Sequence, residues 1–201
     1  MQTTPQLSKE IARALKRMPN NDGIFARQIR RARVVMGQST TTREIAGDRE
    51  EIARKASIVK VGGEPLRRLF GFLGITRNLP VLEKSAAGLG MVALLPENDG
   101  VVHRPPLLIR VGKEIYPTMA LEMLRVAFNE TSLVLKSYAN GLTGVAIAGR
   151  IIPTDESGRI WFHYAPHDGA RFVSAKDVLH GEVGANRLKG KLVLIGTSTA
   201  S

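Results

Sequence analysis

The most suggestive chemistry in this sequence lies near its C-terminus, where Gly190 and Lys191 precede the apolar run LVLI. A Walker-type phosphate loop needs four residues between its first glycine and the Gly-Lys pair, and a serine or threonine after the lysine. Here five residues separate Gly184 from Gly190, and Leu192 follows the lysine. We therefore interpret Gly190 and Lys191 as a turn, and we predict that residues 192–195 form a buried strand.

Histidine, serine and cysteine patterns point to no catalytic or metal site. His163 and His167 are four residues apart, but Pro166 lies between them and the segment reads as the end of a strand, not as a zinc-binding helix. The chain has no Gly-x-Ser-x-Gly motif and no cysteine. The stretch GLGMVA at 88–93 matches a dinucleotide-binding pattern in its letters, yet it precedes a strand and opens no helix. We predict no catalytic residue, no metal and no cofactor, and so no enzymatic activity in this chain.

Charge is distributed unevenly along the 201 residues, which carry a net charge of +11. Residues 1–80 hold 16 basic and 7 acidic side chains, whereas residues 81–201 hold 13 and 11. A basic patch attracts nucleic acid or anionic lipid. Aromatic residues make up only 5% of the chain, and none alternates with the densest arginines as a base-stacking surface requires. We expect no nucleic-acid partner, and a basic nucleic-acid-binding module stays the alternative of another class.

The overall composition predicts one folded domain. Hydrophobic residues make up 43% of the chain and charged residues 23%, which is enough apolar material for a core. No apolar run approaches the ~18 residues of a membrane span, and the start lacks the apolar core of a secretion signal. We expect this stretch to be a soluble part cut from a larger protein.

Apolar spacing predicts alternating helices and strands. Helices are expected over residues 5–17, 22–31, 48–56, 78–90, 117–128 and 174–181. Strands are expected over residues 34–37, 58–63, 91–96, 101–111, 114–117, 144–153, 159–166 and 192–195, with residues 92–95 and 192–195 buried in the sheet. This order mixes crossovers with hairpins, so we predict a single α/β domain with a mixed β-sheet flanked by helices.

The last 120 residues carry a series of short motifs. An Asp-Gly turn followed by arginine comprises Asp99, Gly100 and Arg104, and Tyr116 and Pro117 open a helix. An Ile-Pro pair at 152–153 precedes the aromatic run at 161–164, and Gly190 and Lys191 lead through three apolar residues to an Ile-Gly pair ending at Gly196. In this order the motifs closely resemble the CHASE domain of the second class, the extracellular sensory domain of bacterial adenylate cyclases and histidine kinases.

The resemblance is strong over residues 80–201 and looser over 1–37, and residues 38–75 carry no recognisable mark. It divides the domain 1–201 into N-terminal helices and a strand (1–37), a variable excursion (38–78) and the best-matching core (79–201). The family's opening strand, rich in Phe-Asp, is not found before residue 1, and the stretch that leads to a membrane helix is not found after residue 201. We therefore expect a domain truncated at both ends.

The resemblance implies a sensor in the periplasmic or extracellular part of a bacterial inner-membrane protein. The expected output is a class III adenylate cyclase, and the alternatives are a histidine kinase or a Ser/Thr kinase. The implied partners are an unknown extracellular ligand or protein, the membrane through flanking segments, and a second copy in a homodimer. A ligand would act by binding two conformations unequally.

Asp99, Gly100 and Arg104 are expected to stabilise a hairpin corner more than to bind a ligand. Aspartate at a turn accepts backbone N–H bonds, and glycine adopts the left-handed backbone such turns use. Arg104 precedes two prolines, so its backbone is extended and its side chain could reach a carboxylate such as Asp99.

We predict a dimer whose interface includes part of the N-terminal third, and whose stability depends on salt. The net excess of nine positive charges in residues 1–80 (16 minus 7) opposes pairing, and salt screens this repulsion over a Debye length of roughly 8 Å at physiological strength. Sedimentation velocity should show a monomer or weak dimer at low salt that shifts towards dimer as salt rises. A strict monomer in every salt would contradict this.

Overall fold

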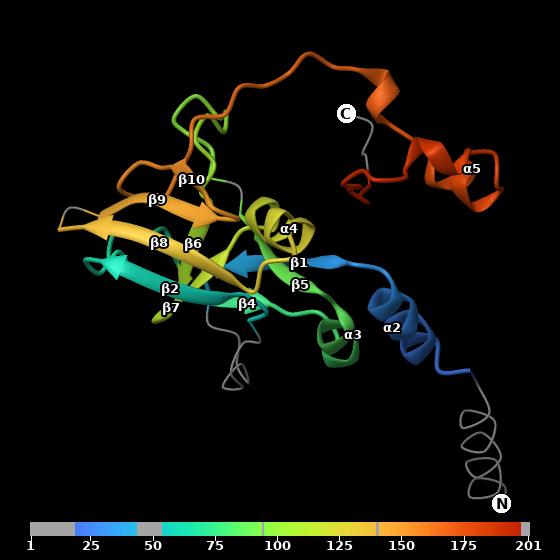
Figure 1. The fold of residues 1–201 in the computed structure, drawn as a ribbon, viewed down its shortest axis with the longest axis horizontal. Coiled ribbons are helices and arrows are strands. Elements are labelled where there is room, and N and C mark those ends of the chain that lie inside the picture. Colours follow the sequence, from blue (N-terminus) through green and yellow to red (C-terminus); the bar gives the residue numbers. More distant parts are fainter. Residues whose placement is uncertain (1–18, 44–53, 94, 140, 198–201) are drawn as a thin grey trace, which may run out of the picture.

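The structure is a computed structural model that describes residues 19–43, 54–93, 95–139 and 141–197. It contains three small β-sheets with helices packed against them, which confirms the predicted α/β class (Figure 1). The chain after β10, orange to red in Figure 1, leaves the sheets and loops back towards α4 and β1. We call residues 161–197 the C-terminal arm. Within the described ranges, no helix has the length and apolar character to cross a bilayer.

The largest sheet has four strands in the order β10-β9-β8-β2. Three of them form an antiparallel meander, and β2 joins parallel to β8 from far along the chain. The turn between β9 and β10 consists of Ala148 and Gly149, both at positive φ (48° and 72°), as a two-residue hairpin turn requires. The strands are β2 (Ser57–Gly62), β8 (Ser132–Tyr138), β9 (Gly141–Ile147) and β10 (Arg150–Pro153).

Two three-stranded sheets complete the fold. In the first, β1 lies between β4, to which it is antiparallel, and β5, to which it is parallel. In the second, β6 pairs parallel with β3 and antiparallel with β7. Their strands are β1 (Val35–Thr41), β4 (Gly74–Thr76), β5 (Gly88–Val92), β3 (Gly71–Phe72), β6 (Leu108–Val111) and β7 (Glu114–Pro117).

Four α-helices are described, and each of them overlaps a predicted one. In α2, the Asn20 side chain caps the first turn by accepting a 2.8 Å hydrogen bond from the Gly23 N–H. The predicted helix at 5–17 lies outside the described residues, as do residues 48–53 of the one at 48–56, and residues 54–56 are not helical. The helices are α2 (Asn21–Arg31), α3 (Pro80–Ser85), α4 (Met119–Ala127) and α5 (Ala175–Leu179), with short 3-10 turns at Gly169–Arg171 and Ala185–Arg187.

The main apolar core lies between the four-stranded sheet and the elements around α4. Side chains from β8 and β9 meet those of β6, β7 and α4, where Leu108, Leu121, Leu133, Leu135 and Val145 are completely buried. Burying side chains of this kind stabilises a fold by about 1.5–3 kcal/mol each. A second cluster joins α2 to α3 and β5, and a third lies between β5 and the β6–β7 hairpin. The core therefore ends before the C-terminal arm.

The prediction of a buried strand at residues 192–195 is wrong in this structure. These residues form no strand, and Leu192, Val193, Leu194 and Ile195 are 58%, 48%, 70% and 91% exposed. An apolar run becomes a buried strand only where a sheet edge receives it, and residues 161–187 carry the chain away from the three sheets (Figure 1). The local pattern identified an apolar segment without identifying what covers it.

Smaller corrections concern three other predicted strands. The strand placed at 91–96 is β5, which begins at Gly88 and ends at Val92, and Val92 is 44% exposed. Only residues 108–111 of the predicted strand at 101–111 form one, because the two prolines before them lack N–H donors. The aromatic run at 161–164 is extended but belongs to no strand.

Helix α4 packs so closely on β5 that two glycines are required there. A Cβ atom on Gly90 would lie 2.4 Å from the Met119 Cα, which is backbone and cannot move aside. A Cβ atom on Gly88 would lie 2.7 Å from Glu122 Oε1. The glycines that resemble a dinucleotide motif in sequence therefore serve helix–strand packing.

A buried ion pair connects this helix to its surroundings. Glu122 and Arg125 are 0% and 5% exposed, and Arg125 donates to both carboxylate oxygens of Glu122 at 2.8 and 2.6 Å. Glu122 also accepts from the Leu89 N–H at 3.2 Å. The remaining guanidinium donors bind the carbonyls of Glu130 (2.6 Å) and Ala87 (3.1 Å). One pair thus joins α4 to β5 and to the loop that precedes β8.

A second buried carboxylate joins α3 to the β4–β1–β5 sheet. Glu83 is 1% exposed and accepts hydrogen bonds from the Gln38 amide (2.7 Å), the Arg77 guanidinium (2.7 Å) and the Asn78 N–H (3.0 Å). Buried charges persist only when they are paired and hydrogen-bonded in this way.

We predict that Arg125→Met lowers the free energy of unfolding by about 3–5 kcal/mol, because it leaves the buried Glu122 carboxylate unpaired. Urea denaturation measures this change. The exposed Arg150→Met should change stability by less than about 0.5 kcal/mol. The double variant Glu122→Gln/Arg125→Met should recover part of the loss, because no charge then remains buried. Equal losses for Arg125→Met and Arg150→Met would contradict the structural role of the pair.

Candidate functional site

A tight turn after β5 begins the candidate site. The Gly100 N–H donates to the Glu97 carbonyl at 2.9 Å, and Gly100 has φ of +80°. Asp99 Oδ1 accepts from the Val101 N–H at 3.0 Å, and Asp99 Oδ2 lies 2.7 Å from His103 Nε2. Asp99 and Gly100 therefore occupy a turn with the chemistry that the sequence predicts for them, although their functional role stays a prediction.

The guanidinium of Arg104 forms an ion pair with the Glu97 carboxylate across this turn. Its Nε and Nη2 donate to the two carboxylate oxygens at 2.8 and 3.1 Å, a bidentate geometry that arginine favours. The expected partner, Asp99, binds His103 instead, because Glu97 on the opposite side of the turn faces the extended Arg104. The hydrogen bond from Arg104 holds the pKa of Glu97 below its usual value of 4.5, and it raises the pKa of Arg104.

A second arginine reaches the same place from the turn after β10. Asp155 Oδ1 accepts from the backbone N–H groups of Ser157 and Arg159 at 3.0 and 2.9 Å. Its Oδ2 accepts from Arg159 Nε at 2.7 Å. The Arg159 guanidinium also lies over the Phe70 ring, 5.6 Å from its centre.

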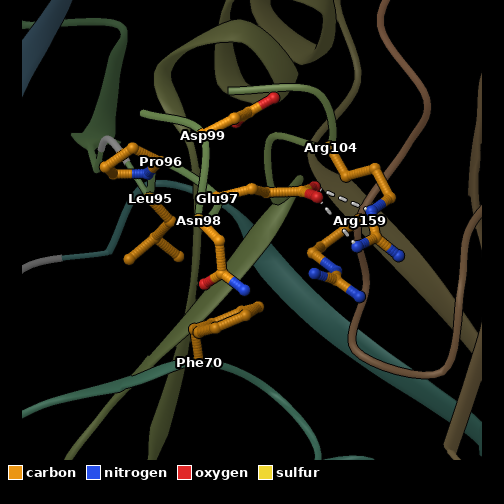
Figure 2. A pocket seen from close by; sticks show the side chains of 8 residues that line it. All are labelled: Phe70, Leu95, Pro96, Glu97, Asn98, Asp99, Arg104 and Arg159. Carbon is orange, nitrogen blue, oxygen red and sulfur yellow. Dashed lines mark hydrogen bonds and ion pairs between the residues drawn. The ribbon is translucent and has the colours of Figure 1, made fainter. Parts of the chain in front are cut away.

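These groups line an open cleft of about 540 Å³. In Figure 2 the Glu97 and Arg104 side chains point toward each other, and Arg159 lies beside them. Each of the two arginines is already paired with a carboxylate. A ligand that carries a carboxylate or phosphate could replace Glu97 in the Arg104 fork. The cleft is lined by Phe70, Leu95, Pro96, Glu97, Asn98, Asp99, Arg104 and Arg159.

A neighbouring cleft of about 600 Å³ shares both arginines. Trp161, 71% exposed, forms part of its lining, and the Arg104 guanidinium lies 5.1 Å from the centre of the indole ring. The buried Thr154 hydroxyl has no hydrogen-bond partner among the described residues. Arg104 therefore stands between two hollows, with Glu97 on one side and Trp161 on the other.

The segment that holds Arg104 is also paired with the start of the C-terminal arm. Three backbone hydrogen bonds join the two segments. The Leu107 N–H donates to the Gly158 carbonyl at 2.8 Å, the Ile160 N–H to the Pro105 carbonyl at 3.1 Å, and the Phe162 N–H to the His103 carbonyl at 3.0 Å. The Tyr164 hydroxyl donates to the Val102 carbonyl at 2.8 Å. The segment that carries Arg104 therefore contacts the backbone of the arm directly, so a movement of this segment in the cleft would reach the arm.

The structure brings together only part of the predicted site. Asp99, Gly100 and Arg104 lie in one loop at the cleft. Tyr116 and Pro117 are buried in β7, and Tyr116 packs in the third core cluster. The remaining motif residues lie in the exposed part of the arm, and none of them lines either cleft: Gly190, Lys191 and Gly196.

Sequence reasoning missed Glu97, Asp155, Arg159 and Trp161. For Asp155, the spacing Asp-x-x-Gly-Arg could have indicated an aspartate that folds the turn and pairs with the arginine four residues on. Glu97 precedes Arg104 by seven residues through an irregular loop, a spacing that carries no signal of contact.

The described residues thus form an α/β domain with an open cleft lined by two arginines and two acidic side chains. The family model of the CHASE2 domain matches residues 3–201, so the chain belongs to the CHASE2 family. CHASE2 domains are extracellular sensory domains. The match confirms the resemblance and includes residues 38–75, where the sequence showed no recognisable motif. Searches of the curated proteins and of the solved structures gave no significant match.

We predict that Arg104→Gln raises the pKa of Glu97 towards 4.5, because the charged hydrogen bond to the carboxylate is lost. A depressed carboxyl pKa stabilises the fold at pH above the unfolded value, and this contribution disappears as the pH falls through the folded pKa. A ¹³C NMR titration of the carboxyl carbons measures the change.

Asp99 provides the internal control. Its pKa is held below 3.8 chiefly by His103, so it should stay lowered in Arg104→Gln and rise in His103→Asn. A Glu97 titration that is the same in the wild type and in Arg104→Gln would contradict the pairing.

Proposed function

We propose that this chain is the sensory domain of a transmembrane bacterial receptor whose cytoplasmic output is a class III adenylate cyclase. Membership of an extracellular sensory family supports the sensory part. The periplasmic side of an inner membrane is the proposed location, and a homodimer is the proposed working form. A histidine kinase or Ser/Thr kinase is the alternative output.

The cleft around Arg104 is the proposed sensing site. Arg104 is the observation that carries this assignment, because it lines both hollows, pairs with Glu97 and lies against Trp161 at the start of the arm. A ligand with a carboxylate or phosphate group competes with Glu97 for the guanidinium. Once Glu97 is displaced, the position of Arg104 against Trp161 changes, and with it the first residues of the arm.

The energy that such a switch requires is small. A tenfold change in the ratio of two conformations corresponds to roughly 1.4 kcal/mol of differential binding. Hydrogen bonds to charged groups contribute about 1.5–3 kcal/mol each. The exchange of one carboxylate for another in the Arg104 fork can therefore supply a difference of the required size. This holds provided that the ligand also makes a further contact with the protein that forms in only one of the two conformations.

We expect Arg104→Gln and Trp161→Ala, each in the full-length receptor, to change basal cyclic AMP formation in membranes by about tenfold, because both remove the link between the cleft and the arm. The exposed Arg150→Gln should leave it unchanged. All three side chains are at least partly exposed, so thermal unfolding of the isolated domain should move by only about 1–2 °C.

Three outcomes have separate meanings. Membranes that form no cyclic AMP under any condition would refute the cyclase output, and a kinase assay on the same membranes would then test the alternative. Normal output from both cleft variants would refute the role of the cleft. A large fall in thermal stability in either variant would show that the residue serves the fold instead.

A further inference from the structure

The second hollow beside Arg104, of about 600 Å³, combines an apolar lining with charged side chains. Its apolar part includes Ile152 and Ile160, and both of these pack against the main core cluster. The core therefore sets the positions of these two side chains. The charged part consists of Arg104, Arg159 and Asp155. A lining of this kind suits a ligand that has an apolar body and one charged group.

Trp161 adds a flat aromatic surface to this hollow. Its side chain is 71% exposed, and among the described residues its ring contacts the Arg104 guanidinium but no other aromatic ring. The residues on either side of it, Ile160 and Phe162, donate backbone hydrogen bonds to the segment that carries Arg104. The indole is therefore held next to the arginine with most of its surface in water, and a second flat ring can stack on it.

The two arginines keep hydrogen-bond donors that their carboxylate partners do not use. Glu97 accepts from Nε and Nη2 of Arg104, whereas Asp155 accepts only from Nε of the Arg159 guanidinium. No group in the described part of the chain accepts from Arg104 Nη1 or from the two terminal nitrogens of Arg159. The side chains of Arg104 and Arg159 are 30% and 21% exposed, so their cations are partly shielded from water. The Nη1/Nη2 fork of Arg159 matches the geometry of a carboxylate.

Both arginines act on the place that the Glu97 carboxylate occupies. Arg159 lies beside the pair of Glu97 and Arg104 (Figure 2). The pKa of Glu97 is lowered chiefly by the hydrogen bond from Arg104, and the positive charge of Arg159 lowers it further. A carboxylate of a ligand that binds the Arg159 fork is therefore placed close to the Arg104 guanidinium, where it can replace Glu97.

The charge balance favours a carboxylate over a phosphate. Arg104 and Arg159 are matched by Glu97 and Asp155, so these four side chains carry no net charge. A monocarboxylate that replaces Glu97 exchanges one negative charge for one. A phosphate group carries about −1.5 to −2 at pH 7, so the same exchange would add charge that the two arginines do not balance.

We propose that the ligand of this site is an aromatic monocarboxylate. Its carboxylate binds the forks of Arg159 and Arg104 in place of Glu97. Its ring stacks on the Trp161 indole, over the apolar lining of the second hollow. Because it names the ligand of the sensing site, this inference rests on the proposed function of the cleft.

The ring supplies the contact that only one conformation makes. While Glu97 holds Arg104, the guanidinium lies over the indole, 5.1 Å from its centre. Once Arg104 turns to the carboxylate of the ligand, the ring of the ligand takes that face of Trp161. The stacking energy is therefore gained only after Glu97 has been displaced, and it favours the displaced conformation.

Trp161 is the single tryptophan of the chain, so its fluorescence reports the ring contact without an added label. The chain is titrated with benzoate, cyclohexanecarboxylate, acetate and inorganic phosphate, and calorimetry measures each affinity independently. We expect a saturable change in fluorescence with benzoate. The affinity for benzoate should be at least tenfold higher than for acetate or phosphate, and several-fold higher than for cyclohexanecarboxylate, whose ring is apolar but not flat.

Variants separate the two halves of the site. By calorimetry, Trp161→Leu should bind benzoate no better than acetate, and Arg104→Gln should lose at least tenfold in affinity. Arg159→Lys keeps the charge beside Asp155 but has no planar fork, so it should bind benzoate several-fold more weakly. The exposed Arg150→Gln lies outside both hollows and should bind as the wild type does. Thermal unfolding of each variant checks that the fold is retained.

Three results would overturn the ligand class. They are acetate or phosphate binding as tightly as benzoate, cyclohexanecarboxylate binding as tightly as benzoate, and no saturable binding of benzoate up to tens of millimolar. The proposed function is tested separately by cyclic AMP formation in membranes. Altered output from Arg104→Gln together with no benzoate binding would refute the ligand class alone. Benzoate binding together with normal output from the cleft variants would refute the sensing role and leave the ligand class standing.

Discussion

The ion pair of Glu122 and Arg125 is the interaction on which the arrangement of this domain depends. Its five hydrogen bonds join α4 to the start of β5 and to the loop before β8. The pair fits because Gly88 has no side chain at the point where Glu122 approaches. The free energy that a buried pair contributes is modest, but each of its members is costly to bury alone, so the pair permits one relative position of helix and strand.

The other carboxylate–arginine pairs of the domain are less buried than this one the closer they lie to the surface. Glu83 joins α3 to β1 and β4 in the interior, whereas Asp155 and Glu97 hold their arginines at the partly exposed cleft. The fully buried carboxylates therefore hold the helices against the strands, and the half-exposed carboxylates lie at the cleft. Because solvent screens the outer pairs, their partners exchange at less cost than those of the inner pairs. The domain combines a rigid frame with one surface where charged partners can be replaced.

The sequence predicted those features that depend on neighbouring residues. The amphipathic pattern at residues 117–128 predicted α4, and the Asp-Gly turn at residues 99–100 lies where the sequence predicts it. Features that depend on distant residues were not predicted. Glu122 and Arg125 look like a surface pair three residues apart, and only the approach of Gly88 buries them. The apolar run at 192–195 shows the opposite error, since its composition indicates burial but gives no information on the surface that covers it.

The pairing of residues 102–107 with residues 158–164 has a mechanical consequence. Its hydrogen bonds run across two antiparallel segments, and the arm leaves from the Tyr164 end. Tension that draws the arm sideways, away from residues 102–107, therefore acts on these bonds one at a time and not together. Tyr164 would detach from Val102 first, then Phe162 from His103, and Gly158 from Leu107 last. A pull in this direction thus peels the arm from the domain at low force, and it reaches the backbone on either side of Arg104 before the core.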